Sequence, residues 1–292
     1  MSIEQLPIWI VYLGTFLLGL SIGSFLNVVI ARLPTRMEQE FASECADFCG
    51  TDSPPLKPQR FFGLDYLLWP SSHCPKCKTA IKAWQNIPVI SYLLLKGKCG
   101  HCKAPISIRY PIVELSSALL SLLTIYLLGA TPAGYFSLIL VWGLMALTFI
   151  DIDHQLLPDN ITLPLLWLGL FANLSFTFTD IESAIIGAIS GYLVLWFIFQ
   201  VFRLITDKEG MGYGDFKLYA LFGAWLGWQM LPQILMIASV LGAVLGVLWI
   251  SIKGRDKSLP IPFGPYLAVA GLIALFGGDE INRAYLQFAG IG

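Results

Sequence analysis

Six stretches of this sequence contain no charged residue, and each is long enough for a helix that crosses a lipid bilayer, which needs about 20 predominantly apolar residues. Hydrophobic residues make up 56% of the 292 positions and charged residues only 13%. That composition excludes an ordinary soluble globular domain. The sequence therefore predicts an all-α integral membrane protein. The uncharged stretches are residues 5–31, 115–150, 160–179, 183–202, 218–252 and 258–278.

Two of these stretches are too long for one helix, and each has helix-breaking residues near its middle. Gly129–Pro132 divides the first and Trp228–Pro232 divides the second. Proline and glycine both disfavour a continuous helix. We therefore expect about eight transmembrane helices. They are predicted near residues 8–30, 112–129, 133–150, 161–178, 183–203, 216–228, 231–252 and 261–277.

The distribution of basic residues predicts the orientation in the membrane. With eight alternating crossings, every Lys and Arg except Arg283 lies on one face or flanks it. The positive-inside rule assigns that face to the cytoplasm. Both termini are then expected outside the cytoplasm.

A long polar segment after the first helix predicts a three-part organisation. Residues 1–31 form the first transmembrane helix, residues 32–110 a cytoplasmic loop domain, and residues 111–292 a seven-helix membrane domain. Basic charge and Pro34 are expected to end the first helix. Residues 35–60 are acidic and contain prolines, so an irregular segment is expected there.

The loop domain contains two C-x2-C pairs, Cys74 with Cys77 and Cys99 with Cys102. Their separation is typical of a four-thiolate zinc ribbon. The alternative is a set of disulfides or redox pairs. Zinc is favoured because the charge distribution places this loop in the reducing cytoplasm, where structural disulfides are rare.

Four thiolates complete a tetrahedron and leave no open position, so the metal is expected to be structural. In a loop with little core of its own, metal binding of about 10–16 kcal/mol can supply most of the folding free energy. His73 and His101 adjoin the pairs but are expected to lie outside the ligand set. Cys45 and Cys49 have no recognisable spacing and stay unassigned.

Two features of the first and second helices have alternative interpretations. Gly19, Ser21 and Gly23 fit the G-x-S-x-G pattern of serine hydrolases, but that motif requires a strand-to-helix turn. The two glycines at i, i+4 favour a small-residue packing face instead. Glu114, near the cytoplasmic end of the second span, either binds an amino group of a substrate or is an interfacial charge.

A glycine-rich segment that ends in a carboxylate precedes the sixth helix. Gly210, Gly212 and Gly214 lead to Asp215 and then Lys217. Such glycines allow positive φ angles and close approach of other groups. A carboxylate beside a membrane span is a candidate functional residue, because insertion near mid-bilayer costs about 2.5–3.5 kcal/mol. The alternative is a polar turn between two helices.

Asp151 is the expected partner of Asp215. Asp151 closes the third predicted span and Asp215 opens the sixth, so two complete crossings separate them. An even number of crossings returns the chain to the same face, and both carboxylates are then at the cytoplasmic boundary. Asp159, before the fourth span, is predicted to cap that helix.

Two carboxyl groups in one site favour an aspartic protease. They share one proton because like charges at short distance do not ionise together easily. The ionised group takes a proton from water, and the protonated group donates to the scissile carbonyl. The sequence does not determine which aspartate is the base and which is the acid, because the pair titrates as a unit.

Across nearly its whole length the chain resembles the bacterial type IV prepilin leader peptidases, which are membrane aspartic proteases of the G-x-G-D type. The resemblance rests on six segments taken together, since G-x-G-D alone is a weak signal. They are residues 23–28, the zinc knuckles with residues 86–88 between them, and residues 109–114, 151–159, 212–217 and 262–265.

The resemblance implies that Asp151 and Asp215 are the catalytic pair, with Gly212, Gly214 and Lys217 as supporting motif residues. It also implies that Cys74, Cys77, Cys99 and Cys102 bind one structural Zn²⁺. The function expected is cleavage of the basic leader of type IV prepilins and of pseudopilins of type II secretion. The cut is expected at the cytoplasmic face of the bacterial inner membrane, before an apolar helix that stays in the bilayer.

Many members of that family also methylate the new amino terminus with S-adenosylmethionine, so residues 111–292 are expected to be the catalytic part of a bifunctional enzyme. The sequence shows no G-x-G-x-x-G loop and no recognisable site for the methyl donor, and this activity follows from the resemblance alone. The lipid bilayer is an expected partner, and a nucleic acid is not.

Two other functions remain open at this level. One is another G-x-G-D intramembrane protease that processes signal-peptide-like substrates, which has no evident need for the four-cysteine domain. The other is a transporter whose membrane carboxylates carry protons or cations. A transporter is expected to show inverted repeats with paired broken helices, and no such repeat is found.

Overall fold

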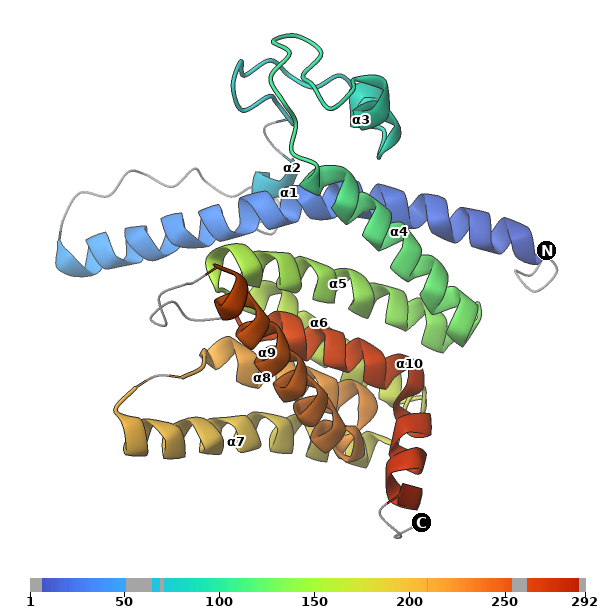
Figure 1. Ribbon diagram of the computed structural model, residues 1–292, viewed down its shortest axis with the longest axis vertical. Coiled ribbons are helices and arrows are strands. Elements are labelled where there is room, and N and C mark those ends of the chain that lie inside the picture. The colour runs from blue at the N-terminus through green and yellow to red at the C-terminus, as the bar shows by residue number, and fades with distance from the viewer. Residues whose placement is uncertain (1–6, 51–64, 69–70, 209, 254–261, 289–292) are drawn as a thin grey trace. The chain divides into compact units, whose positions relative to one another are not determined.

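The computed structural model describes residues 7–50, 65–68, 71–208, 210–253 and 262–288 (Figure 1). Within these residues every regular element is a helix, which confirms the all-α prediction. The chain divides into two compact units, unit 1 at Met1–Tyr126 and unit 2 at Leu127–Gly292.

Unit 1 contains α1 and the helices of the loop domain, and α4 runs from unit 1 into unit 2. The elements are α1 (Ile8–Cys49), α2 (Asp65–Leu68), a 3-10 turn (Ala83–Asn86), α3 (Ile90–Leu94) and α4 (Arg109–Leu128). Unit 2 continues with α5 (Pro132–His154), α6 (Asp159–Asn173), α7 (Ile181–Thr206), α8 (Tyr213–Leu226), a 3-10 turn (Trp228–Met230), α9 (Leu231–Lys253) and α10 (Gly264–Phe288).

Eight of the described helices overlap the predicted spans, and both predicted breaks are present. α4 ends at Leu128 and α5 begins at Pro132, with Thr131 capping α5 through its hydroxyl. The second break begins at Gly227, whose φ is 82°, and continues as the 3-10 turn that follows it.

Among the described helices, five are long and apolar enough to cross a membrane. α6 and α8, with 15 and 14 residues, are shorter than the other predicted spans. The coarse prediction of a multi-helix membrane protein therefore agrees with the structure. The five helices are α1, α4, α5, α7 and the segment Trp228–Leu248.

The prediction that the first helix ends near Pro34 is wrong, because α1 continues to Cys49. A proline inside a helix removes one backbone hydrogen bond. Here Leu33 and Pro34 are both buried. Arg32 also donates from its guanidinium to the carbonyl oxygens of Tyr66 and Leu67, each at 3.1 Å. These contacts hold the helix together across the proline.

The irregular segment predicted at residues 35–60 is likewise helical as far as Cys49, and residues 51–60 lie outside the described residues. Arg36 and Glu40 form an i, i+4 ion pair with a 2.7 Å separation. Such pairs support a helix, and Met, Glu, Gln and Ala are good helix formers. The helix ends at Gly50, whose φ of 66° suits glycine.

The small-residue face predicted on the first helix is confirmed within unit 1. A Cβ atom on Gly19 would lie 2.7 Å from the Cα of Ala118, and one on Gly23 would lie 2.6 Å from the Cα of Glu114. α1 and α4 therefore pack backbone against backbone, as small residues allow in membrane helices. The serine-hydrolase interpretation has no strand-to-helix turn to support it here.

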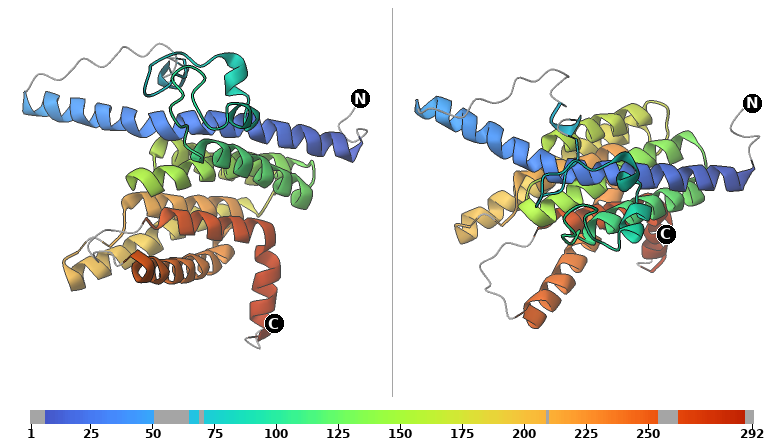
Figure 2. Two further views of the ribbon diagram at one scale, coloured as in Figure 1. Left: turned by 45° about the horizontal axis from the view of Figure 1, so that its top comes forward. Right: turned by 90° about the horizontal axis from the view of Figure 1, so that it is seen from above.

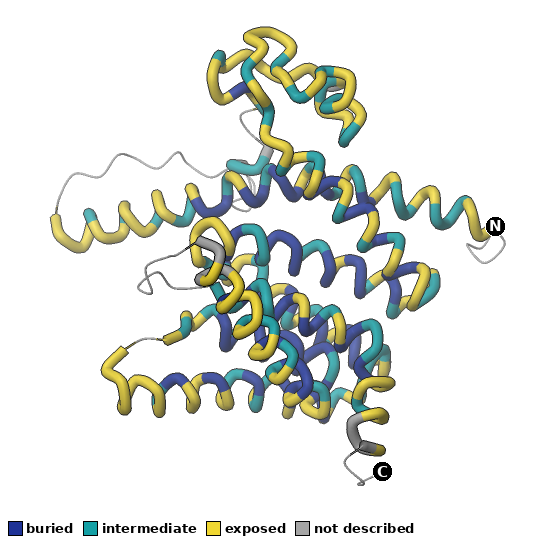
Figure 3. Tube along the Cα trace, in the orientation of Figure 1, coloured by how far each residue is buried: buried dark blue, intermediate teal, exposed yellow. Residues whose placement is uncertain are grey.

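α8 is the buried centre of unit 2, with α6, α7 and α10 packed around it (Figures 2 and 3). Between Phe216 and Trp225 its apolar side chains are buried on every face, as expected for a helix enclosed by others. Gly187 of α7 and Gly223 of α8 meet so closely that a Cβ atom on either would overlap the other backbone. Trp225 donates from Nε1 to the carbonyl oxygen of Leu165 at 2.8 Å, so its polar group is satisfied. This packing fixes the helix that carries Asp215.

Candidate functional site

Asp151 lies in the last turn of α5 and is only 5% exposed. Its carboxyl group faces Gly264, the first residue of α10, and interacts with the backbone N–H of that residue. A Cβ atom on Gly264 would lie 2.6 Å from Asp151 Oδ2. Among the described residues, Oδ2 has no hydrogen-bond partner. A buried polar atom without a partner is costly for stability, and such atoms are often found at functional sites.

Asp215 lies in the first turn of α8 and is 7% exposed. The backbone N–H of Gly212 donates to Asp215 Oδ2 at 3.1 Å. The carboxylate thus occupies the N-terminal end of a helix, where unpaired N–H groups favour negative charge.

Leu157, in the connection between α5 and α6, packs against a glycine next to each aspartate. A Cβ atom on Gly214 would lie 2.7 Å from Leu157 Cβ, and one on Gly264 would lie 3.2 Å from Leu157 Cδ1. Since Gly214 precedes Asp215 and Gly264 contacts Asp151, one leucine side chain links the surroundings of the two carboxyl groups. The two groups are also close enough for a direct electrostatic interaction.

Close packing, and not an unusual backbone angle, explains the glycine immediately before Asp215. The sequence suggested positive φ values in this loop, but Gly212 has a φ of −83°, and no glycine of the loop is among the positive-φ residues described. Gly214 is required because Leu157 fills the space of its missing side chain. Gly212 has room for a Cβ atom, whose nearest neighbour would be Asp215 Oδ2 at 3.7 Å.

Asp159 does not cap α6 as predicted. Pro158 occupies the cap position, and Asp159 is in the first turn without a capping hydrogen bond. Its two carboxylate oxygens instead accept hydrogen bonds from Lys217 Nζ, each at 2.7 Å. This ion pair joins the start of α6 to the first turn of α8, two residues after Asp215.

The four cysteines predicted as metal ligands come together in unit 1. Their Sγ atoms all lie within 4.8 Å of one another. Cys74 Sγ and Cys102 Sγ are 3.8 Å apart, and a tetrahedron with Zn–S bonds of about 2.3 Å has edges of about 3.8 Å. The donor set therefore fits a four-coordinate metal ion.

The two knuckles have the same local structure. Cys74 N–H donates to the carbonyl oxygen of Thr79 at 3.0 Å, and Cys99 N–H donates to that of Ala104 at 2.8 Å. Hydrogen bonds with Thr79 lower the pKa of the Cys77 thiol to about 6. A lowered pKa favours the thiolate, the form that binds metal. Cys45 and Cys49 lie apart from this cluster as exposed thiols at the end of α1.

Comparisons with known proteins match both units. A family model described as the bacterial peptidase A24 N-terminal domain matches residues 17–128, and one described as the type IV leader peptidase family matches residues 138–247. The prepilin leader peptidase/N-methyltransferase of Pseudomonas aeruginosa is 52% identical over 278 residues, which cover 95% of this chain and 94% of that protein. The protein of that name from Legionella pneumophila is 45% identical over 280 residues, 96% of each chain.

The chain belongs to the type IV leader peptidase family. The same-named protein of Stutzerimonas stutzeri is 50% identical over 278 residues, again 95% of this chain and 94% of that protein. No solved structure matches the chain.

The sequence alone predicted no role for Leu157 or Gly264. Gly264 lies in the Pro262–Pro265 segment that carries part of the resemblance, but nothing in its local sequence connects it to Asp151. Leu157 is one apolar residue in an apolar region. Only the packing of the α5–α6 connection against α8 and α10 identifies both residues as part of the site.

Neither interpretation of Glu114 describes what the structure shows. The side chain is only 8% exposed. Its Oε2 accepts a 2.7 Å hydrogen bond from the backbone N–H of Val89, and its carboxyl group also interacts with the Ser24 hydroxyl. Glu114 thus attaches the loop domain to α1 and α4 within unit 1.

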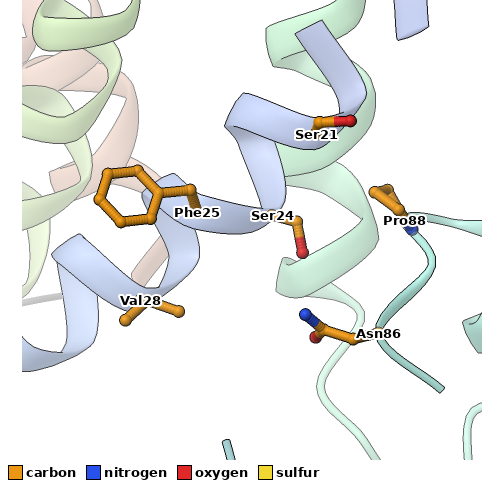
Figure 4. A pocket seen from close by; sticks show the side chains of 6 residues that line it. All are labelled: Ser21, Ser24, Phe25, Val28, Asn86 and Pro88. Carbon is orange, nitrogen blue, oxygen red and sulfur yellow. The ribbon is translucent and has the colours of Figure 1, made fainter. Parts of the chain in front are cut away.

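Beside Glu114 is a pocket of about 300 Å³ between α1 and the segment 86–88 (Figure 4). The Ser24 hydroxyl and the Asn86 amide face each other across it. The pocket is lined by Ser21, Ser24, Phe25, Val28, Asn86 and Pro88.

Replacing Gly264 with alanine is expected to lower the rate of substrate cleavage by about 10²-fold, because displacing a reacting group by about 1 Å can have that effect. The new methyl group would meet Asp151 Oδ2 at 2.6 Å and force the carboxyl group to move. Gly277→Ala, in the same helix, is the matched control, since its Cβ atom would have no neighbour closer than 3.9 Å. Equal kcat values for the two variants would contradict the role of Gly264.

The Asp159–Lys217 pair is expected to contribute little to global stability. Its side chains are 49% and 29% exposed, and exposed ion pairs contribute about 0.2–1 kcal/mol. A double-mutant cycle of Asp159→Asn and Lys217→Met, followed by thermal unfolding in detergent, measures the coupling. A coupling free energy well above that range would show that the pair is a major determinant of the fold.

Proposed function

We propose that this protein is a membrane aspartic endopeptidase in which Asp151 and Asp215 form the catalytic pair. Its substrates are type IV prepilins and the pseudopilins of type II secretion, which carry a short basic leader before an apolar helix. Cleavage takes place at the cytoplasmic face of the bacterial inner membrane. Methylation of the new amino terminus with S-adenosylmethionine follows.

One observation carries the assignment of the pair. Two buried carboxyl groups from helices far apart in the sequence interact electrostatically, and a glycine next to each of them packs against Leu157. Each faces the start of a helix, α10 for Asp151 and α8 for Asp215. Burial of two acidic side chains without a cationic partner between them destabilises a fold, and sites of this kind are typically functional.

The chemistry follows from the proton that the pair shares. One carboxyl group, ionised, removes a proton from a water molecule, and that water attacks the scissile carbonyl carbon. The other carboxyl group donates its proton to the carbonyl oxygen as the tetrahedral intermediate forms. The carboxyl group that took the proton from water then gives it to the amide nitrogen, so that the C–N bond breaks, the leader leaves as a carboxylic acid and the new amino terminus is a free amine. The Gly212 N–H holds Asp215 Oδ2 by a hydrogen bond, while Asp151 Oδ2 is buried and has no hydrogen-bond partner among the described residues.

The membrane topology that fits this chemistry has eight crossings, with both termini outside the cytoplasm. α5 then ends, and α8 begins, at the cytoplasmic boundary, where water reaches the carboxyl groups. The substrate helix approaches laterally through the bilayer, and its basic leader stays on the cytoplasmic side.

The four-cysteine cluster binds one structural Zn²⁺ in this proposal. Cys74, Cys77, Cys99 and Cys102 would hold it, and with four thiolates it would supply no open coordination position for catalysis. The metal stabilises the fold of the loop domain, while the peptide bond is cleaved by the aspartates of unit 2.

Incubation of the purified protein with a model prepilin, with and without S-adenosylmethionine, tests the proposed function. We expect release of the leader under both conditions and methyl incorporation only with the donor. Mass spectrometry of the processed amino terminus measures both. An intact prepilin, or cleavage at a position other than the leader junction, would refute the peptidase assignment.

A further inference from the structure

One segment of the loop domain has an apolar surface although it belongs to the polar part of the chain. Between Lys82 and Lys96 the sequence has 13 residues without a charge. A run of this length is too short to cross a bilayer and is typical of a buried core helix or of an interfacial or re-entrant segment. A buried core is excluded, because five of its large apolar side chains are 44% to 69% exposed. They are Trp84, Ile87, Ile90, Leu93 and Leu94.

We propose that residues 83–95 dip into the lipid leaflet on the side of the membrane that the loop domain occupies. The partner of this apolar surface is then the acyl region of anionic phospholipids. The proposal goes beyond leader cleavage and methyl transfer, and every residue that it uses belongs to unit 1.

The depth of the segment follows from its contacts with α1. Asn86 and Pro88 line one pocket together with Ser21 and Val28 of α1 (Figure 4). These two α1 residues lie 11 and 4 positions before Arg32, the first charged residue after the apolar part of α1. At 1.5 Å per residue they are roughly 16 Å and 6 Å along the helix from Arg32. Half of a hydrocarbon core of about 30 Å is about 15 Å, so the segment lies at the level of the acyl chains.

The charges around the segment complement an anionic leaflet. Residues 71–108 contain six lysines and no acidic residue. All six lysines are exposed, and Lys82, Lys96 and Lys98 flank the uncharged segment. Lysines near an anionic membrane surface are attracted to it, and tryptophan prefers the boundary between headgroups and acyl chains, which suits Trp84. An acidic soluble partner would account for the lysines but not for an apolar segment beside the uncharged part of α1.

The backbone of the segment has hydrogen-bond partners of its own, as irregular backbone at membrane depth requires. Val89 lies in a turn with a φ of 59°, and its N–H donates to Glu114 Oε2 at 2.7 Å. The N–H groups of Ser91 and Leu93 donate to the carbonyl oxygens of Ile87 and Val89, each at 3.1 Å. The buried carboxyl group of Glu114 thus satisfies a backbone donor for which lipid offers no acceptor.

Spin labels on the full-length protein in lipid nanodiscs test the proposal. Leu93→Cys and Leu94→Cys are each made in a background that carries Cys45→Ser and Cys49→Ser, and one copy is placed in each disc of three parts phosphatidylethanolamine to one part phosphatidylglycerol. Phe41→Cys is the matched control, since Phe41 is 69% exposed and Leu93 67%, and Phe41 lies on α1 beyond its apolar part. The background protein without an added cysteine measures any labelling of the four clustered cysteines.

Two relaxation reagents distinguish lipid from water and from protein, because oxygen concentrates in the acyl region and a nickel chelate stays in water. The ratio of oxygen to nickel collisions is expected to be at least fivefold higher at Leu93 and Leu94 than at Phe41. Nickel collisions at Leu93 and Leu94 as frequent as at Phe41 would place the segment in water and overturn the proposal. Labels shielded from both reagents would show that protein covers this surface, which also overturns it.

Charge reversal tests the role of the anionic headgroups. The triple variant Lys82→Glu, Lys96→Glu and Lys98→Glu is expected to lower the oxygen-to-nickel ratio at Leu93 at least threefold in discs with phosphatidylglycerol. In discs of phosphatidylcholine alone the change should be smaller. Circular dichroism of each variant checks that the helices are retained, and Lys96→Glu alone, with a smaller change in the same direction, replaces a triple variant that loses them. An unchanged ratio in the anionic discs, or an equal change in both kinds of disc, would refute the preference for anionic lipid.

Discussion

Asp151→Asn and Asp215→Asn are each expected to lower kcat for leader cleavage by a factor of about 10² to 10⁴, the usual contribution of a general acid or base. Asparagine keeps the size of the side chain but can neither accept a proton from water nor give one to the carbonyl oxygen. Because the two carboxyl groups act as one unit, the double variant is expected to be about as slow as either single variant. Cleavage of a model prepilin by each purified variant measures the effect.

The control for these variants is Asp207→Asn at the end of α7. Asp207 has a φ of 52°, which asparagine tolerates well, and it is exposed. This substitution removes one negative charge from unit 2, as the two site variants do, but at a position outside the site. Cleavage at the wild-type rate by either Asp151→Asn or Asp215→Asn would show that the pair is wrongly assigned. Additive losses in the double variant would contradict a shared proton.

Removal of the metal is expected to unfold the loop domain and leave unit 2 folded. A site with four thiolates contributes about 10–16 kcal/mol of binding free energy, more than a domain with little buried core can replace. Of the four clustered cysteines only Cys74 is buried, and α3 in this domain has just 5 residues. After chelation, or in Cys99→Ser, hydrogen–deuterium exchange should rise over residues 72–106 and change little over α5 to α8.

Cys49→Ser is the matched control, since Cys49 is an exposed thiol outside the cluster. It should keep the wild-type metal content and exchange pattern. Metal analysis of the wild type is expected to find one zinc ion per chain. A protein purified without chelators that contains no bound metal, or exchange over residues 72–106 that chelation does not change, would contradict the proposed centre.

The sequence predicted most of the membrane helices because their determinants are local. A run of apolar residues and a breaker such as Pro132 or Pro232 act within one or two turns. The same local reasoning was wrong at Pro34. There the helix continues because Leu33 and Pro34 are buried and Arg32 bonds to carbonyl groups of α2, and these contacts involve residues distant in the sequence.

The four-cysteine cluster was predictable for a similar reason. Two cysteines in a C-x2-C pair are positioned by their own turn, and the hydrogen bonds at Cys74 and Cys99 lie within a few residues of each pair. The aspartates were predicted by counting crossings, which places two residues on one face and leaves their distance undetermined. Glu114 shows the limit of that approach, because its partner Val89 is 25 positions away in the sequence.

By itself, the sequence determined that this chain forms several apolar helices able to cross a membrane and a cluster of four cysteines, since apolarity and cysteine spacing are properties of neighbouring residues. The position of the two aspartates on one side of the bilayer stays a prediction. Only the tertiary structure decided that Leu157 fills the spaces left by Gly214 and Gly264, that Lys217 binds Asp159, and that Glu114 accepts a hydrogen bond from the Val89 N–H. The physical reason is that each of these contacts joins side chains from separate helices. Their approach depends on how whole helices pack, and no local pattern records it.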